Sequence, residues 1–229
     1  MTIDKDSFYN IAYAIINALY NANLPIVFKG MTVTRLALIE NNISFSRETR
    51  DIDGDWTGDR ISLSELEKVI NDALSNLNNI YVKAFRDYSD RTSAGFDIYQ
   101  NEIKISSFDL SIRKNEFVKL YDVNGIRFYG QTINKMIADK ITVISTNKVF
   151  RRSKDLLDLY YLSTITNISK NNIIDIISKC NNTLGNFNEL INSKKDVEHA
   201  YNSMYWIENK PSFEDVYDCC INIAKKFIK

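Results

Sequence analysis

Apolar residues recur at helical spacing at the start of the chain and then give way to strand-like runs. One face of a helix predicted over residues 6–21 carries Phe8, Ile11, Ile15, Ile16 and Leu19. The apolar run 26–28 predicts a short strand, which ends at Lys29-Gly30 and is followed directly by a helix over 32–41. The order strand, glycine, helix favours phosphate binding, because the N-terminus of a helix presents unpaired N–H groups.

Strand patterns dominate residues 50–129. A helix begins at Ser62 or Ser64 and runs to about residue 77, and Ser64 and Glu67 have the spacing of a capping box. Asn124-Gly125, a strong signal for a two-residue turn, predicts a hairpin over 117–129. The remaining predicted strands are 50–56, 81–88, 92–99 and 102–112.

From residue 131 onward the pattern is helical throughout. The predicted helices are 132–145, 151–164, 169–182, 194–205 and 212–229. Strands followed by helices indicate an α+β protein. We therefore expect an α/β core over residues 1–130 and a helical domain over 131–229, with no internal repeat.

The formal net charge is zero, from 29 basic and 29 acidic residues, which excludes a polybasic nucleic-acid binder. The charge divides unevenly, because residues 1–130 carry 15 basic and 18 acidic residues whereas 131–170 carry 7 basic and 3 acidic. An acidic half and a locally basic half suit a metal site and a phosphate or RNA site, respectively.

One histidine and three cysteines exclude several classes of site. His199, in a charged helical stretch, is expected at the surface, and a single histidine does not suffice for common zinc or iron sites. The odd number of cysteines argues against a disulfide framework and fits a cytoplasmic setting. We expect no signal peptide and no membrane partner, since the longest apolar stretch, 11–20, is too short to span a bilayer.

Three aspartates are candidates for binding a hard cation. Asp51 and Asp53 would point to one face of a strand, where two carboxylates can hold Mg²⁺, although surface pairs of this kind are common. Asp109, in another β-rich run, is either an ordinary half-exposed strand residue or a third metal ligand. A calcium loop starting at Asp51 is excluded, because Trp56 and Ser62 replace its required Gly and Glu.

Charged residues of the helical half have both ordinary and functional interpretations. Lys140 lies on the apolar face of its helix, so it either snorkels to water or points into a cleft toward a polyphosphate. Arg151, Asp155 and Asp158 form one helical stripe beside Lys154, which is typical of a solvated face with pairs such as Lys154–Asp158.

Together these segments resemble the AbiEii/AbiGii nucleotidyltransferases, the toxins of abortive-infection and MenT-type toxin–antitoxin systems, over about residues 26–162. The segments are Lys29-Gly30-Met31-Thr32, Arg47-x-Thr49-x-Asp51-Ile52-Asp53, Asp109, Ala138-Asp139-Lys140 and Arg151-x-x-Lys154-Asp155-x-x-Asp158. The resemblance implies a DNA polymerase β-like nucleotidyltransferase core, a mixed sheet flanked by helices, followed by a C-terminal helical bundle.

The resemblance also implies roles for individual residues. Asp51, Asp53 and Asp109 would bind the catalytic Mg²⁺ or Mn²⁺ ions, and Asp109 would also serve as a base. Nucleotide binding would fall to Lys29, Gly30, Met31, Thr32, Lys140, Arg151, Lys154 and Asp155, with Lys140 and Asp158 in the catalytic set. After Gly30 the family usually has a second small residue, Gly or Ser. This chain has Met31 there, which still offers its backbone N–H.

The implied activity is transfer of a nucleoside monophosphate from an NTP to an RNA acceptor, the 3′ end of tRNA, which blocks translation. The implied partner is a cognate antitoxin encoded nearby, in phage defence. The alternatives are a protein or small-molecule acceptor, or a nucleotide-binding protein without catalysis. Aromatic residues near the C-terminus are interpreted as bundle core rather than partner surface: Tyr201, Tyr205, Trp206, Phe213 and Tyr217.

Overall fold

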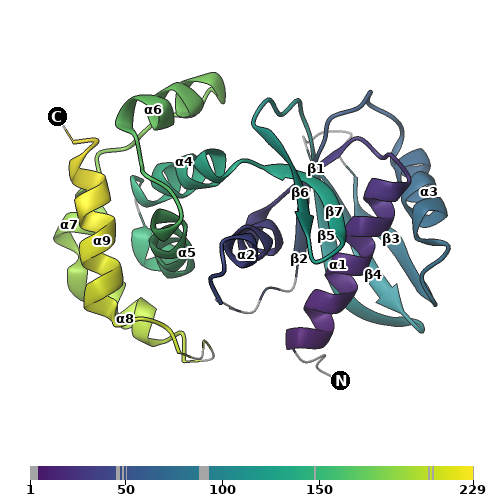
Figure 1. Ribbon diagram of the computed structural model, residues 1–229, viewed down its shortest axis with the longest axis horizontal. Helices are drawn as coiled ribbons and strands as arrows, with labels where there is room; N and C mark the ends of the chain where they lie inside the picture. Colours follow the sequence, from purple (N-terminus) through teal and green to yellow (C-terminus); the bar gives the residue numbers. More distant parts are fainter. Residues whose placement is uncertain are drawn as a thin grey trace. The chain divides into compact units, whose positions relative to one another are not determined.

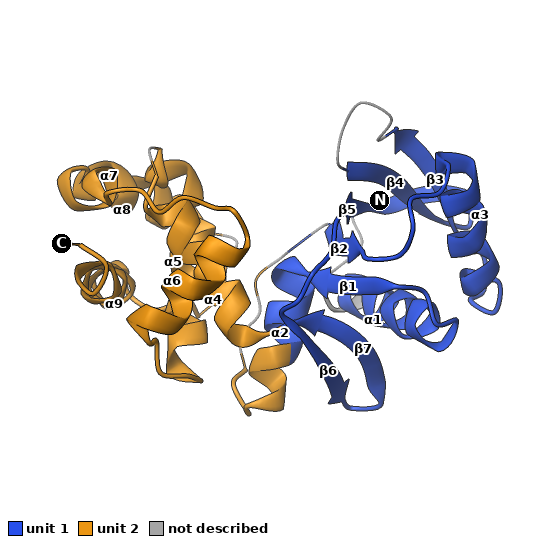
Figure 2. Ribbon diagram, turned by 90° about the horizontal axis from the view of Figure 1, so that it is seen from above, with its two compact units in different colours: residues 1–36, 49–131 blue, residues 37–48, 132–229 orange. Residues whose placement is uncertain are grey.

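The chain folds into two compact units, shown in different colours in Figure 2. Unit 1 comprises residues 1–36 and 49–131, and unit 2 comprises 37–48 and 132–229. The computed structural model describes residues 5–44, 47, 49, 51–87, 93–146, 148–205, 207 and 209–228, without the side chains of 5–7. The domain boundary expected near residue 130 lies beside the 131/132 division, but segment 37–48, which we assigned to the first domain, belongs to unit 2.

Unit 1 is built on one mixed sheet, which has seven strands within the described residues, in the order β3-β4-β5-β2-β1-β7-β6 (Figure 1). Strand β2 pairs in parallel with β5, and β1 with β7, while the other neighbours are antiparallel. The strands are β1 (Ile26–Lys29), β2 (Asp51–Trp56), β3 (Ile80–Arg86), β4 (Ser93–Gln100), β5 (Ile103–Ile112), β6 (Val118–Val123) and β7 (Ile126–Gln131). The hairpin predicted at Asn124-Gly125 is confirmed, with positive φ at both residues.

One face of this sheet is a ladder of aromatic rings. Phe28 of β1 lies 6.2 Å from both Phe108 and Phe128, measured between ring centroids, and Tyr121 stacks on Phe128 at 5.0 Å. All four rings are at most 1% exposed. Helix α1 (Lys5–Asn21) packs on β7 and on α3 (Leu63–Leu74). Because side chains alternate along a strand, the residues between these apolar positions lie on the opposite face.

Helix α3 also closes the edge of the sheet. The Asn71 side chain accepts from the Val82 N–H (2.8 Å) and donates to the Val82 carbonyl (3.0 Å), and Glu67 accepts from the Ala84 N–H (2.7 Å). These contacts satisfy backbone groups of edge strand β3 that would otherwise be open to pairing. The predicted capping box is therefore wrong in register: Ser62 and Glu65 form it, and Glu67 serves the edge strand.

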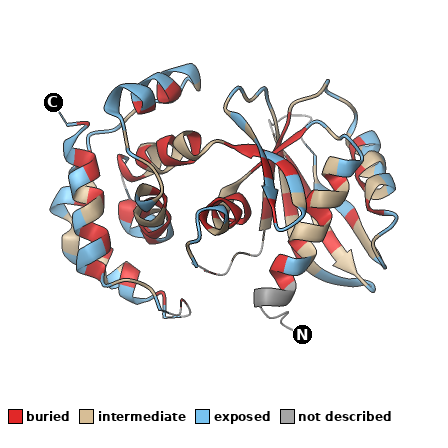
Figure 3. Cartoon of the chain, viewed as in Figure 1, coloured by how far each residue is buried: buried red, intermediate tan, exposed pale blue. Residues whose placement is uncertain are grey.

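Unit 2 is helical in its described parts. Buried residues of α9 recur at positions three and four apart, which gives the helix one buried stripe and one exposed stripe (Figure 3). Its helices are α4 (Ile133–Ile144), η1 (Val149–Arg152), α5 (Ser153–Thr164), α6 (Lys170–Lys179), α7 (Asn188–Asn192), α8 (Lys194–Asn202) and α9 (Phe213–Lys225). Helix α2 (Gly30–Glu40) begins in unit 1 and ends in unit 2. The short η1 and α7 have too few residues to show a helical period in the sequence.

The C-terminal aromatic residues divide in two. Tyr201, Phe213 and Tyr217 are buried, as core residues should be, whereas Tyr205 is 85% exposed, so its assignment to the core is wrong. Trp206 lies outside the described residues. His199 is exposed in α8, as expected.

Candidate functional site

The three aspartates proposed as metal ligands lie on one face of the sheet. Asp51 and Asp53 are two residues apart on β2, and the parallel register places Asp53 opposite Asp109 and Asp51 opposite Ser107. Paired residues of adjacent strands share a face, so all three carboxylates lie on the face opposite the aromatic ladder. We call this the polar face; β4 contributes Gly95, which is in register with Asp109.

Asp51 and Asp109 each bind a neighbouring side chain. The Thr49 hydroxyl donates to Asp51, and the Arg86 guanidinium pairs with Asp109, with both side chains of that pair about one third exposed. Within the described ranges, no three His, Cys, Asp or Glu side chains are close enough together to hold a metal ion. The three aspartates thus share a face without converging on one point. Arg86 was missed by sequence analysis, because only the strand order places β3 near β5.

Gly30, the first residue of helix α2, lies next to the Asp53 carboxylate. It has φ +72°, and a side-chain carbon at this position would contact a carboxylate oxygen of Asp53 and lie 3.2 Å from its Cβ. Glycine is therefore required both by conformation and by space. The start of α2, where the N–H groups of the first turn have no partner within the helix itself, consequently lies beside the Asp53 carboxylate.

Thr32, in the first turn of α2, is buried without a hydrogen bond to its hydroxyl. Its side chain is 1% exposed, and no partner for Oγ1 exists within the described part of the chain. A buried polar atom without a partner is unusual, and this hydroxyl is available to hydrogen-bond a ligand. Met31 beside it is 4% exposed and packs in the core, so its side chain does not project from the turn into solvent.

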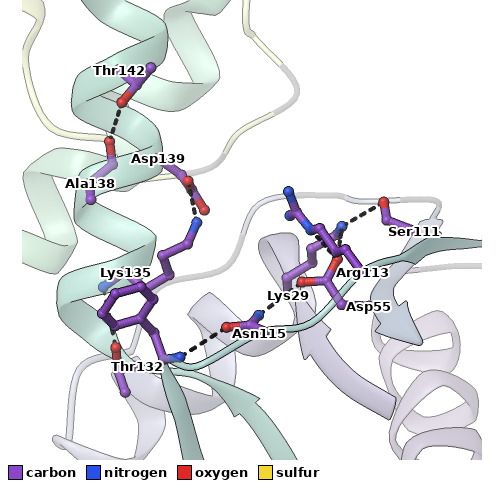
Figure 4. A network of polar contacts seen from close by, with 11 residues as sticks. Lys29, Asp55, Ser111, Arg113, Asn115, Thr132, Lys135, Ala138, Asp139 and Thr142 are labelled. Atoms are coloured by element: carbon purple, nitrogen blue, oxygen red, sulfur yellow. Dashed lines mark hydrogen bonds and ion pairs between the residues drawn. The ribbon is translucent and has the colours of Figure 1, made fainter. Parts of the chain in front are cut away.

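Lys29 is engaged by a carboxylate that sequence analysis did not assign to the site. Its Nζ lies 2.5 Å from Oδ1 of Asp55, which is fully buried and also accepts from Arg113 (2.9 Å) and Asn115 (2.9 Å). Figure 4 shows these side chains pointing at Asp55, with Ser111 accepting a second bond from Lys29 (3.0 Å). Asp55 is therefore a structural anchor, and Lys29 is not directed at the carboxylate pair.

Two further features of unit 1 help to delimit the site. The Gln131 side chain is buried on the same face as Lys29, and its amide nitrogen has no partner within the described residues. Nothing in the sequence singled it out. A cleft of about 330 Å³, lined by Tyr20, Pro25 and Tyr129, lies at the opposite end of β1 from Gly30, so it is not part of this site.

Four charged residues from the family-like motifs form one buried network in unit 2: Arg47, Lys140, Asp155 and Asp158. Asp158 of α5 is fully buried; it accepts from Arg47 through both oxygens (2.7 Å each) and from Lys140 of α4 (2.8 Å). Lys140 also pairs with Asp155 at 2.6 Å. The Arg47 contact explains why segment 37–48 belongs to unit 2, although β-strands of unit 1 follow it in sequence.

The network stabilises the charged forms of its members. Burial on its own would raise the pKa of Asp158, but Lys140 and Arg47 outweigh it and hold that pKa well below its ordinary value. Burial would lower the pKa of Lys140, but Asp158 and Asp155 outweigh it, so the pKa is raised. Asp158 and Lys140 therefore both stay ionised and neutralise each other's charge.

This network changes the interpretation of the helical stripe. Lys140 neither snorkels to water nor points freely into a cleft, because its ammonium group binds Asp155 and Asp158. Asp158 is not on a solvated face, and its partners are Arg47 and Lys140 rather than Lys154. The periodicity of one helix could not reveal partners that come from other segments.

The remaining predicted binding residues of unit 2 are exposed cations. Arg151, at the end of η1, and Lys154, in the first turn of α5, are both exposed. Sequence analysis did not single out Lys135 of α4, which is buried and whose Nζ lies 2.5 Å from Oδ1 of Asp139 (Figure 4). No helix within the described residues is long and apolar enough to cross a membrane.

The mixed sheet, with paired aspartates beside a helix that begins at a glycine, has counterparts among solved structures. The structure is similar to the MenT4 nucleotidyltransferase toxin of Mycobacterium tuberculosis (TM-score 0.52, 11% identity, 98% of this chain and 94% of that chain). It is also similar to the antibiotic-resistance factor ANT(2'')-Ia (TM-score 0.51, 15% identity, 78% and 93%). Both likenesses show the fold, and the predicted fold class is confirmed.

The family follows from the sequence itself. The family described as "Nucleotidyl transferase AbiEii toxin, Type IV TA system" matches residues 14–204. The chain belongs to this family of nucleotidyltransferase toxins, which confirms the resemblance noted from its motifs. No match is found among curated proteins.

Proposed function

We propose that this toxin transfers a nucleoside monophosphate from an NTP to an RNA acceptor, the 3′ end of tRNA, and thereby blocks translation. The observation that carries the proposal is the contact between Gly30 and Asp53, which joins a helix N-terminus to a row of carboxylates. That contact supports a reaction in which a triphosphate lies against carboxylates rather than in a separate site. Membership of a nucleotidyltransferase family supports the same reaction.

We assign Mg²⁺ or Mn²⁺ ions to the three aspartates, whose carboxylates would have to move closer together to bind them. Asp51 and Asp53 offer hard oxygen ligands from one strand, and Asp109 offers a third from its register neighbour. Asp109 would have to exchange its contact with Arg86 for the metal. When bound, such ions would neutralise charge on the attacking and leaving oxygens.

Residues of this chain would bind the substrate and move one proton. The N–H groups at the start of α2 and the Thr32 hydroxyl would hold the triphosphate. An acceptor hydroxyl would attack the α-phosphate, its proton would pass to Asp109, and the bond to the β-phosphate would break as pyrophosphate leaves. In unit 2, Arg151 and Lys154 are exposed, and Asp158 and Asp155 hold the ammonium group of Lys140.

The biological setting follows from the family. We propose that a cognate antitoxin encoded nearby opposes this toxin, and that the pair acts in the cytoplasm in abortive infection, a form of phage defence. Expression of the chain without its antitoxin should arrest growth. Asp53→Asn should abolish the arrest, because it removes one carboxylate from the proposed metal site.

The proposal is tested by incubating purified protein with total RNA, Mg²⁺ and each α-³²P-labelled NTP in turn. We expect one nucleotide to label a tRNA-sized band, and Asp53→Asn to abolish the label. Asp122→Asn is the matched control, because Asp122 is half exposed and pairs with Arg127 on the β6–β7 hairpin. Label in protein or in a small molecule would identify another acceptor, and no label with any acceptor class would favour nucleotide binding without catalysis.

A further inference from the structure

One exposed aromatic ring and a pair of half-buried rings lie on the polar face. Phe85 of β3 is 54% exposed, and its ring covers Gly95, where a side-chain carbon would lie 2.7 Å from the ring. Gly95 is in register with Asp109, which is in register with Asp53. An exposed phenylalanine ring therefore lies over Gly95, one strand away from the row of proposed metal ligands.

A second pair of rings continues this surface along the same strands. Tyr81 of β3 and Tyr99 of β4 stack with their centroids 5.2 Å apart and their planes 7° apart. Tyr99 is four residues from Gly95, a distance of about 13 Å along a strand. Alternation places Tyr81 and Tyr99 on the polar face, because Val82 and Ile98, between them in sequence, belong to the buried core.

Cations are interleaved with these rings. Lys83 Nζ lies 5.2 Å from the Tyr81 centroid and 5.1 Å from that of Tyr99, and it forms no ion pair with any described carboxylate. Arg86 and Lys104 lie 5.6 and 5.7 Å from the Phe85 centroid. Asp109 and Asp97 pair with those two cations, and the Tyr81 hydroxyl donates to Glu102 (2.8 Å), so Lys83 is the cation of this group without an ion pair among the described residues.

We propose that this surface, the aromatic platform, binds the single-stranded end of the RNA acceptor. The platform consists of Tyr81, Lys83, Phe85, Arg86, Tyr99 and Lys104. Bases would stack on Phe85 and on the Tyr81–Tyr99 pair, and Lys83 would contact a phosphate. The proposal rests on the proposed nucleotidyltransferase function, since it assigns the acceptor to the strands beside Asp109.

The chemistry favours single-stranded RNA over a folded protein partner. Every base has a π-face, so exposed rings with nearby cations suit an unstacked strand of any sequence. Continuity with Asp53 and Asp109 would bring the terminal hydroxyl of such a strand to the carboxylates. The Tyr81–Tyr99 pair, farther along the sheet, would then bind nucleotides that come before the reacting end in the RNA sequence.

The test is binding of a fluorescein-labelled single-stranded RNA 12-mer, measured by anisotropy in EDTA without NTP. Phe85→Leu should raise the dissociation constant at least about fivefold, from loss of one stacked base, and Phe85→Trp should restore binding. Tyr205→Leu is the matched control, because Tyr205 is a highly exposed ring in unit 2 and should leave binding unchanged. Urea unfolding of each variant checks that the fold is kept.

Lys83→Gln tests the phosphate contact separately. It should reduce the dependence of log K on log salt by about 0.7, the value for one phosphate on a single strand. Equal binding by wild type and Phe85→Leu, or an equal loss in Tyr205→Leu, would overturn the platform. So would binding of duplex RNA as tight as that of the single strand.

Failure of the platform can be told apart from failure of the proposed function. If the wild type labels RNA but Phe85→Leu binds and labels it equally well, the acceptor binds elsewhere and the transferase assignment stands. If the wild type binds the 12-mer through Phe85 but labels no RNA, the platform stands and the transferase assignment fails. Label in protein without RNA binding would overturn both the RNA acceptor and the platform.

Discussion

Asp158→Asn removes the charge that holds two buried cations together in unit 2. Asp158 is fully buried and accepts three hydrogen bonds of 2.7–2.8 Å from Arg47 and Lys140. An asparagine of the same shape keeps one oxygen but turns an NH₂ group toward a cationic donor. The variant therefore tests whether the network stabilises the fold.

The expected cost follows from the burial of the partners. Removing one member of a buried ion pair costs about 3–5 kcal/mol, because the remaining charge is left without compensation. Lys140 keeps Asp155 at 2.6 Å, which places the expected loss near the lower end, at about 3 kcal/mol. With a urea m-value of about 2 kcal/mol per M, the midpoint should fall by about 1.5 M.

The loss of unfolding free energy in Asp158→Asn should depend on pH. The pKa of Asp158 is held below its ordinary value of 3.8, mainly by Lys140 and Arg47 acting against burial. A lowered carboxyl pKa contributes stability that is fully present above pH 3.8 and is lost as pH falls further. The difference between wild type and Asp158→Asn should therefore stay constant from about pH 5 to about pH 8 and shrink below pH 3.8.

Urea unfolding followed by far-UV circular dichroism measures both effects. Asp175→Asn is the matched control, because Asp175 forms the same kind of pair with Lys179 on α6 but both side chains are 53% exposed. That control should change stability by less than about 0.5 kcal/mol. A loss in Asp158→Asn no larger than the control's would refute the assignment of a stabilising buried network.

Three further substitutions test the carboxylate row and its supports. Gly30→Ala should reduce nucleotide transfer by about 100-fold, because the added side-chain carbon displaces Asp53. Its control is Gly125→Ala, where φ is +82° and nothing lies within 4 Å; this variant should lose only about 1–2 kcal/mol of unfolding free energy and keep its activity. Equal activities of the two variants would contradict the role of Gly30. Thr32→Val should raise the KM for the NTP without lowering the unfolding free energy, because the hydroxyl has no partner within the described residues; a loss above about 1 kcal/mol would show a structural bond instead. Asp55→Asn should destabilise the chain by about 3 kcal/mol in urea, since it leaves Lys29 and Arg113 uncompensated, and an unchanged midpoint would exclude its anchoring role.

Local patterns in the sequence sufficed for most elements of unit 1. Alternation predicted the strands, and Asn124-Gly125 predicted the hairpin, because both signals depend on neighbours in sequence. The spacing of Asp51 and Asp53 predicted their common face in the same way. The position of Asp109 next to Asp53 required the parallel pairing of β2 with β5, which no local pattern encodes.

Long-range partners account for what the sequence could not predict. Asp55 looks like its neighbours Asp51 and Asp53, but Lys29 and Arg113 bury its charge and make it an anchor. Asp158 looks like a surface residue of its helix until Arg47 is placed against it. In both cases a charged residue is buried because its counter-ion comes from a distant segment, so the pattern of one element misjudges its exposure.

The most direct test of the nucleotidyltransferase assignment is to compare two positions of the label in the NTP. Purified toxin is incubated with RNA, Mg²⁺ and the active nucleotide labelled with ³²P at either the α- or the γ-phosphate. Nucleotidyl transfer predicts label in RNA from the α-position alone, with one pyrophosphate released per label and none with Asp53→Asn. Label in RNA from the γ-position, or label from the α-position that persists in Asp53→Asn, would contradict the account.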